Sequence, residues 1–307
     1  MGTPDFAVPT LKALLNEKYN VVGVITAPDR PAGRGQKLRE SAVKLFAKSK
    51  GLPILQPKNL KNEKFLEALQ SLKPNLQIVV AFRMLPKVVW QLPKYGTFNL
   101  HASLLPEYRG AAPINWAIIN GETKTGVTTF FIDEKIDTGE IILQQEIRIE
   151  SDENAGALHD KLMQIGSELV IETVGYINDD NVKTQPQTKL VQLKSANKLN
   201  KDNCKIDWSD TINNIYNKIR GLSPYPTAWC YFQNDIEKLP VKIYDVTYET
   251  IDHDNELGII ISTKENAKVA VKGGYIILKE LQLPGKRKMT IKSLLNGFQF
   301  NLTAKML

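Results

Sequence analysis

Cysteine is scarce in this sequence of 307 residues, which contains only Cys204 and Cys230. Two cysteines are too few for a disulfide framework or a cysteine-based zinc cluster, and their scarcity favours a reducing compartment. No stretch of about 18 apolar residues occurs that would predict a membrane-spanning helix. The first residues also lack the charged flank and the apolar run of a signal peptide. We therefore expect a cytoplasmic protein that does not bind membranes.

Histidine is scarce too, and the common phosphate-binding motifs are missing. His101, His159 and His253 lie far apart in the sequence, so we expect no catalytic metal. No Gly-x-Gly-x-x-Gly motif follows an apolar run, and no Gly-x-x-x-x-Gly-Lys-Ser/Thr motif occurs. These absences argue against a dinucleotide loop and a nucleoside triphosphate loop.

Positive charge, by contrast, is in excess. The chain has 40 Lys and Arg residues against 33 Asp and Glu residues, which gives a formal charge of +7 and a pI near 9.1. This balance favours a polyanionic partner, although some basic proteins bind no nucleic acid. Residues 28–39 contain Arg30, Arg34, Lys37 and Arg39 together with two glycines. The segment is either an ordinary solvated loop or a phosphate clamp, in which arginines make bidentate contacts and glycines allow close backbone approach.

The first part of the chain alternates short apolar runs with segments of helical periodicity. Residues 21–26, 77–82 and 97–101 are typical of strands buried on both faces. Two further strands are predicted over about 126–132 and 140–147, before a long amphipathic helix over about 153–177. This order predicts an α/β domain over residues 1–177, with a Rossmann-like, open and mainly parallel sheet.

The rest of the chain has a different texture. Residues 178–203 are rich in Lys, Asn, Gln and Thr, which is typical of a linker between domains. A second domain is predicted over 204–307, with one helix over about 209–220 and then several short strands. The strands are predicted over 227–233, 241–248, 258–262, 267–271 and 275–283, with a hairpin turn at Gly273 and Gly274. They predict a small antiparallel β-barrel of the OB type, a fold often used to hold nucleic acid.

Polar residues gather where two predicted strands end. Asn99 and His101 are two residues apart in a strand and therefore project from the same face. The apolar, proline-containing loop 102–110 follows them, and apolar walls beside a few polar groups are typical of small-ligand sites. A second loop carries Asp133 and Asp137, the latter within Asp-Thr-Gly. Aspartic proteases share that tripeptide but need two copies in an all-β fold, and this chain has a single copy between α/β elements.

Taken together, these segments resemble the methionyl-tRNA formyltransferase family, whose wider group uses 10-formyltetrahydrofolate as formyl donor. The resemblance covers nearly the whole chain. The matching segments are Gly2-Thr3-Pro4-Asp5-Phe6-Ala7, the loop 28–38, Asn99-x-His101, residues 103–106 and 108–114, Asp137-Thr138-Gly139, Ile206-Asp207-Trp208 and Pro224 to Trp229.

The resemblance implies a catalytic centre formed by Asn99, His101 and Asp137, without a metal. It also implies that the folate lies between the loops near residues 82–86 and 133–137, and the residues we assign to folate are Phe82, Arg83, Met84, Leu85, Ser103, Leu104, Leu105, Pro106, Asp133, Ile136 and Asp137. The expected partner is initiator methionyl-tRNA, bound through Arg30, Arg34, Lys37 and Arg39, while the oligomeric state stays open.

The expected chemistry suits these residue types. Formyl transfer to an amine passes through a tetrahedral intermediate with an oxyanion, to which the Asn99 amide and the His101 ring can donate hydrogen bonds. Asp137 can orient His101 and help to relay the proton that the amine loses. Two alternatives stay open: a formyltransferase acting on a small amine, such as glycinamide ribonucleotide or an amino sugar nucleotide, and a non-catalytic RNA-binding protein on the same scaffold.

One departure from the family concerns the first strand. Members usually carry a short apolar strand immediately before Gly-Thr-Pro, whereas only Met1 precedes Gly2 here. An empty strand position would leave backbone groups of its neighbours without partners and open a gap in the core. We therefore expect the natural protein to start several residues upstream.

Overall fold

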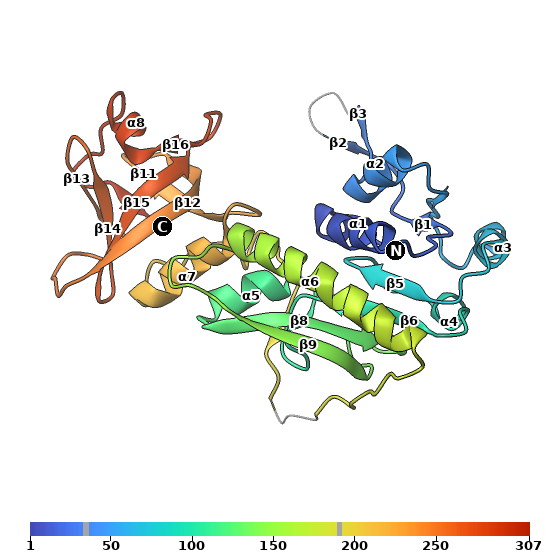
Figure 1. Cartoon of the computed structure of the whole chain (residues 1–307). Helices are drawn as coiled ribbons and strands as arrows, with labels where there is room; N and C mark the ends of the chain where they lie inside the picture. Colours follow the sequence, from blue (N-terminus) through green and yellow to red (C-terminus); the bar gives the residue numbers. More distant parts are fainter. Residues whose placement is uncertain (33–36, 189–191) are drawn as a thin grey trace. The chain divides into compact units, whose positions relative to one another are not determined.

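The computed structural model describes residues 1–32, 37–188 and 192–307. The chain divides into two compact units, each described here by itself (Figure 1). The first consists of Met1–Gly110, Thr125–Ile147 and His159–Ser195, and the second of Ala111–Lys124, Arg148–Leu158 and Ala196–Leu307. The second unit therefore takes in helix α5 (Pro113–Ile119) and the first turn of α6 (Ala155–Asn178).

A mainly parallel sheet forms the core of the first unit. Strand β1 (Val24–Ile25) pairs in parallel with β4 (Ile54–Leu55). Strand β5 (Gln77–Val80) pairs in parallel with β6 (Thr97–His101), followed in the sheet by β8 (Lys124–Phe131) and β9 (Ile141–Arg148). The pair β6 and β8 is antiparallel. The predicted α/β fold class with a Rossmann-like sheet is confirmed.

Helices flank this sheet and connect its strands. They are α1 (Val8–Asn16) after the short 3-10 turn Asp5–Ala7, α2 (Ala42–Ser49), α3 (Glu63–Ser71) and α4 (Lys87–Trp90). The side chains of Ser41 and Asn62 cap α2 and α3, as expected for these residue types at helix starts. Helix α6 lies along β6 and β8, where Gly166 packs against Leu100 and the Thr173 hydroxyl lies 2.8 Å from that of Thr129 (Figure 1).

Met1 and Gly2 form the link between the two parts of the sheet. Gly2 pairs in parallel with Val80, and its amide donates to the Ile25 carbonyl at 3.0 Å. The α-amino group of Met1 donates to the Ile78 carbonyl at 2.6 Å. The strand predicted over 21–26 is regular at Val24–Ile25, and none of the residues that the structure describes pairs with 21–23.

A cavity of about 400 Å³ lies next to Met1, between the segments that lead into β1 and β5. Its apolar lining includes Val21, Val22, Leu72, Leu76, Val174 and Ile177. Burial beside this cavity lowers the pKa of the Met1 amine from 8.0 to about 5. Among the described residues, the two parts of the sheet are joined at the carboxyl ends of β1 and β5, through Met1 and Gly2.

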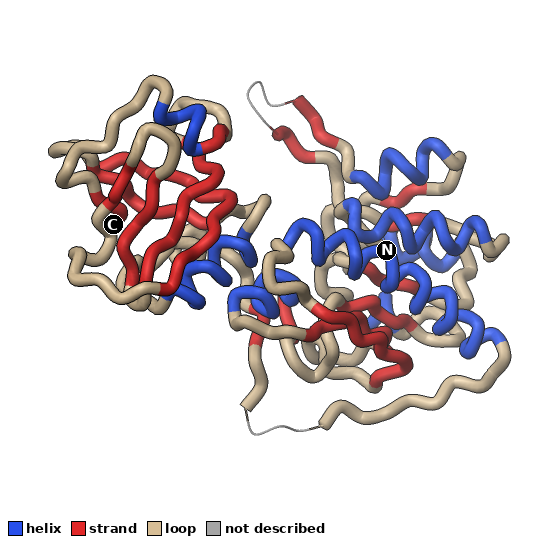
Figure 2. The backbone as a smooth tube through the Cα atoms, turned by 60° about the vertical axis from the view of Figure 1, so that its left-hand side comes forward, coloured by secondary structure: helices blue, strands red, loops and turns tan. Residues whose placement is uncertain are grey.

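The second unit is built around an antiparallel sheet that curls into a nearly closed barrel (Figure 2). Its strands are β11 (Ala228–Gln233), β12 (Lys238–Thr250), β13 (Ile260–Ser262), β14 (Ala267–Val271), β15 (Gly274–Gln282), β16 (Met289–Thr290) and β17 (Lys305–Met306). A bridge between Ile259 and Lys305 brings the two edges together. The predicted antiparallel barrel is confirmed.

Alternation along the strands explains the barrel core. Along β11, Ala228, Cys230 and Phe232 are buried, while Trp229 and Tyr231 are only partly buried on the other face. Helix α7 (Ile212–Leu222), capped by Thr211, adds Ile215 and Ile219 to the same core. Sequence patterns missed β16, β17 and α8 (Ile291–Leu295), since elements of two to five residues carry no periodicity.

The cavity beside Met1 leads to a stability prediction. Adding Lys-Ile-Ile-Phe before Met1 should place an apolar strand between β1 and β5, and each large apolar side chain buried there contributes about 1.5–3 kcal/mol. The melting temperature should rise by about 2–4 °C for each kcal/mol gained. Thermal unfolding followed by circular dichroism measures this rise. The same chain extended by Lys-Gly-Ser-Asp is the control, and equal melting temperatures for both would contradict the prediction.

The pH dependence of stability should change with the same extension. Between about pH 5 and 8 the unfolded chain binds a proton at the Met1 amine that the folded chain does not bind. The stability of the 307-residue chain therefore rises with pH across this window. The extended chain has an amide at this position, so denaturant titrations across the window should show a smaller rise.

Candidate active site

His101 lies at the end of β6 and is only 6% exposed. Its Nε2 atom lies 2.9 Å from the carbonyl oxygen of Tyr108. Because a carbonyl only accepts hydrogen bonds, Nε2 must carry the proton of this contact. The other ring nitrogen, Nδ1, is therefore the one left for chemistry.

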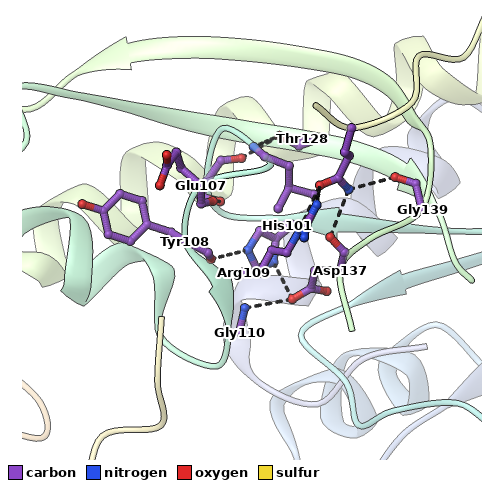
Figure 3. Close-up of polar contacts among 11 residues, drawn as sticks. His101, Glu107, Tyr108, Arg109, Gly110, Thr128, Asp137 and Gly139 are labelled. Carbon is purple, nitrogen blue, oxygen red and sulfur yellow. Dashed lines mark hydrogen bonds and ion pairs between the residues drawn. The ribbon is translucent and has the colours of Figure 1, made fainter. Parts of the chain in front are cut away.

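Asp137 faces that second nitrogen (Figure 3). Its Oδ2 atom lies 3.8 Å from His101 Nδ1 and accepts a hydrogen bond of 3.0 Å from the Gly110 amide. The separation of 3.8 Å is too long for a direct hydrogen bond, but it is short enough for the carboxylate to stabilise a positive charge on the buried ring. Asp137 is thus placed to stabilise the imidazolium form of His101, whereas the Tyr108 carbonyl orients the ring.

Asn99 lies two residues before His101 in β6 and therefore projects from the same face of the strand. Its side chain is partly buried. Within the part of the chain that the structure describes, the Asn99 amide has no hydrogen-bond partner. The three residues predicted as the catalytic centre therefore come from one strand end and one neighbouring loop.

The apolar loop after β6 is fixed to the sheet by buried polar contacts. The Thr128 hydroxyl donates to the Ser103 carbonyl at 2.6 Å and accepts from the Leu105 amide at 3.1 Å. Gln144 donates to both the Leu105 carbonyl and the Thr128 hydroxyl at 2.9 Å. The Ser103 hydroxyl donates to the Glu107 carbonyl at 2.7 Å. These bonds hold the loop that presents the Tyr108 carbonyl to His101.

The loop that carries Asp137 has its own internal support. Thr138 donates to both carboxylate oxygens of Asp133, at 2.8 and 2.9 Å, and the Lys135 amide donates to one of them. A side chain at Gly139 would lie 1.7 Å from the Phe131 carbonyl oxygen, so only glycine fits there. Asp133, which we predicted as a folate residue, is thus engaged within the loop itself.

The two loops predicted to hold folate are linked to each other. Lys87, which follows the loop after β5, donates to Glu134 at 2.7 Å, and this contact lowers the pKa of the Glu134 carboxyl. Met84 and Ile136, one from each loop, are 65% and 61% exposed. The other predicted residues differ in exposure: Leu85 and Leu105 are buried in the core, and the Arg83 guanidinium donates to the carbonyls of Pro57 and Lys58.

The basic segment forms a β-hairpin of β2 (Arg30–Ala32) and β3 (Lys37–Arg39). Arg30 lies directly opposite Arg39, so the two exposed side chains share a face. At the base of the hairpin, Lys44 forms ion pairs with Asp29 and Glu40. Arg34 lies outside the described residues, and Lys37 is described only through its backbone.

Gln187 is a polar residue beside the Asp137 loop that sequence reasoning missed. Its side chain reaches the backbone of the Asp137 loop and the side chain of Arg109. A glutamine in a polar segment without periodicity carries no signal that separates it from its neighbours. The contacts of Thr128 and Gln144 were missed for a related reason, because they depend on strand register.

Within the described ranges, no group of three or more His, Cys, Asp and Glu side chains is placed to hold a metal ion. Over the same residues, no helix combines the length and apolar character needed to cross a bilayer.

Comparisons with known proteins agree with these observations. A family model described as formyl transferase matches residues 1–174, and one described as the formyl transferase C-terminal domain matches residues 198–299. The methionyl-tRNA formyltransferase of Flavobacterium johnsoniae is 59% identical over 305 residues, which cover 99% of this chain and 97% of the relative. That of Flavobacterium psychrophilum is also 59% identical, over 98% of this chain and 96% of the relative.

A solved structure shares the architecture of both units. The N-formyltransferase from Helicobacter canadensis, in complex with folinic acid and dTDP-3-aminofucose, matches with a TM-score of 0.65. The match has 22% identity and covers 94% of this chain and 97% of that one, a likeness that concerns the fold alone. Because the two family models and the two relatives together account for nearly its whole length, the chain belongs to the formyl transferase family.

Proposed function

We propose that this chain transfers the formyl group of 10-formyltetrahydrofolate to the free amino group of initiator methionyl-tRNA, for translation initiation. The observation that carries the proposal is the corner formed by Asn99, His101 and Asp137. It occurs in a chain whose relatives at 59% identity are named methionyl-tRNA formyltransferase.

The folate would bind between the loop after β5 and the loop that carries Asp137. Exposed Met84 and Ile136 supply apolar surface for a flat heterocycle, and the Lys87–Glu134 ion pair joins the two loops. The unpartnered amide of Asn99, among the described residues, fits a ligand oxygen at the end of β6. The folate supplies a formyl carbon bonded to nitrogen, and every other contribution comes from the protein.

Asn99 and His101 would stabilise the charge that develops on the formyl oxygen. The Asn99 amide donates one hydrogen bond, and protonated Nδ1 of His101 donates a second. Because Nε2 is fixed on the Tyr108 carbonyl, the ring does not need to turn during the reaction. Asp137, at 3.8 Å from Nδ1, compensates the positive charge of the imidazolium.

Asp137 would also receive the proton that the amine loses. The attacking nitrogen becomes cationic when the new bond to carbon forms, and a carboxylate is basic enough to accept its proton. Oδ2 of Asp137 is engaged by Gly110 and lies near His101, whereas Oδ1 has no partner among the described residues. Asp137 then gives this proton to the folate nitrogen that leaves the formyl carbon, so that the acceptor nitrogen gains the bond that the folate nitrogen loses.

The acceptor explains the excess of positive charge. The exposed pair Arg30 and Arg39 lies on one face of the β2–β3 hairpin, where it can contact phosphates. Lysines also accompany aromatic side chains in the second unit, where Lys201 lies over Trp229 and Lys205 over Tyr231. Such pairs suit single-stranded RNA, which combines phosphates with exposed bases.

A choice of acceptors tests the proposal directly. The protein is incubated with 10-formyltetrahydrofolate and, separately, with methionyl-tRNA, free methionine or glycinamide ribonucleotide. Formylation of methionyl-tRNA alone is the expected result. Formylation of a small amine but not of the charged tRNA would instead favour a small-molecule formyltransferase, and no turnover with any acceptor would favour a non-catalytic RNA-binding protein.

Substitutions in the catalytic corner should lower kcat without unfolding the protein. Asn99→Ala and His101→Ala should each cost about 100- to 1,000-fold, the usual loss when one oxyanion donor is removed. Asp137→Ala should cost about 100- to 10,000-fold, the usual contribution of a group that accepts a proton in the transition state. Since the three residues act as a unit, the double variants should lose far less than the product of the singles. Asp160→Ala, on the exposed side of α6, is the matched carboxylate control. A single variant with near-normal kcat would remove that residue from the mechanism.

The hairpin arginines should affect use of tRNA and leave use of folate unchanged. The double substitution Arg30→Ala and Arg39→Ala should raise the KM for methionyl-tRNA. It should also reduce the salt dependence of binding by a log-log slope of about 0.7–0.9 for each phosphate that the protein no longer neutralises. Steady-state kinetics at several salt concentrations measure both effects. Lys12→Ala in α1 removes a positive charge elsewhere, and an equal effect of that variant would show the hairpin to be an ordinary solvated loop.

A further inference from the structure

A strap of residues 181–188 follows α6 and runs beside the loop that carries Asp137. The backbones of Gln185 and Ile141 exchange two hydrogen bonds, of 2.8 and 2.9 Å. One residue earlier, the Thr184 hydroxyl donates to the Glu140 carboxylate. The strap therefore has a fixed register against the start of β9, which places Gln187 beside Asp137 and Gly139.

The side-chain amide of Gln187 uses all of its hydrogen-bonding capacity in this corner. Its Nε2 atom donates to the carbonyls of Asp137 and Gly139, at 3.0 and 2.8 Å. Its Oε1 atom accepts from Nε of Arg109 at 3.0 Å and also from Nη2 of the same guanidinium. An amide has two N–H groups and two lone pairs, so no part of it is left over.

The backbone of Asp137 needs such support. Its φ angle is +54°, in the left-handed region that residues with a side chain seldom adopt. This conformation turns the carboxylate toward Gly110 and His101 (Figure 3). The Asp137 carbonyl accepts the hydrogen bond from Gln187. Strained residues persist only where their surroundings hold them. The two hydrogen bonds from Gln187 Nε2 fix the backbone at Asp137 and at Gly139, one residue before and one residue after Thr138.

We propose that Gln187 is a positioning residue for formyl transfer, which keeps the Asp137 carboxylate against Nδ1 of His101. The proposal rests on the function proposed above. Gln187 touches none of the predicted catalytic side chains directly and acts through the backbone of the Asp137 loop. Arg109 fixes the amide from the other side, so that its N–H groups face the two carbonyls rather than the solvent.

The chemistry of the amide suggests the discriminating variants. Gln187→Ala removes all four bonds. Gln187→Glu keeps the acceptor for Arg109 but loses both donors and places a negative oxygen against two carbonyls. A role limited to anchoring Arg109 predicts a functional Gln187→Glu protein, whereas a role in holding the Asp137 loop predicts that both variants fail. Gln185→Ala is the control, because Gln185 contributes only its backbone and its side chain is exposed.

Kinetics should separate positioning from binding. In Gln187→Ala and Gln187→Glu, kcat should fall by roughly 10- to 100-fold, the range expected when a catalytic group moves by up to about 1 Å. The KM values for folate and methionyl-tRNA should stay within about twofold, because the missing interaction acts in the transition state. Gln185→Ala should keep the wild-type values.

Crystal structures of the variants give a measure that needs no turnover. In Gln187→Ala and Gln187→Glu, the Asp137 carboxylate should lie farther from Nδ1 of His101 than the 3.8 Å of the unaltered protein, whereas Gln185→Ala should keep that separation. An unchanged position of the Asp137 carboxylate in Gln187→Ala would overturn the proposal, and so would an unchanged kcat. Failure of the wild-type protein to formylate any acceptor would defeat the proposed function instead, while the structures would still decide whether Gln187 holds Asp137.

Discussion

The hydrogen bond from His101 Nε2 to the Tyr108 carbonyl determines what the rest of the corner is able to do. It fixes one tautomer of a buried ring and leaves the other nitrogen for the reaction. Much of the surrounding structure serves to bring that carbonyl into place. Tyr108 itself has a φ angle of +59°, and its amide donates to the Lys194 carbonyl at 2.7 Å. The loop before it is held to β8 and β9 through Thr128 and Gln144.

The two units reach stability by different routes. In the first, the sheet carries loops at its carboxyl ends, and several of those loops hold residues in left-handed conformations, Ala81, Tyr108 and Asp137 among them. In the second, strict alternation along β11 and the bridge between the barrel edges favour a continuous apolar core. The first unit thus has left-handed residues in the loops where chemistry is proposed, and the second carries pairs of a lysine with an aromatic ring.

Sequence patterns predicted the elements whose residues repeat. Strands 97–101 and 267–271 match β6 and β14 residue for residue, because apolar runs with clear ends fix both limits. The pairing of Asn99 with His101 followed from strand geometry alone. The orientation of the His101 ring could not be predicted in this way. It depends on the Tyr108 backbone carbonyl, and the position of a carbonyl cannot be inferred from the residue type. Gln187 was out of reach for the same reason, because its partners lie about 50 residues earlier in the chain.

The strap determines where the first unit can be divided from the rest of the chain. Residues 178–203 are rich in the residue types typical of a linker, yet the side chain of Gln187 bonds to both the Asp137 and Gly139 carbonyls. A chain cut just after α6 would keep every strand of the sheet in the first unit and lose the Gln187 amide. The first unit, taken as a working module, therefore extends past α6 and through Gln187.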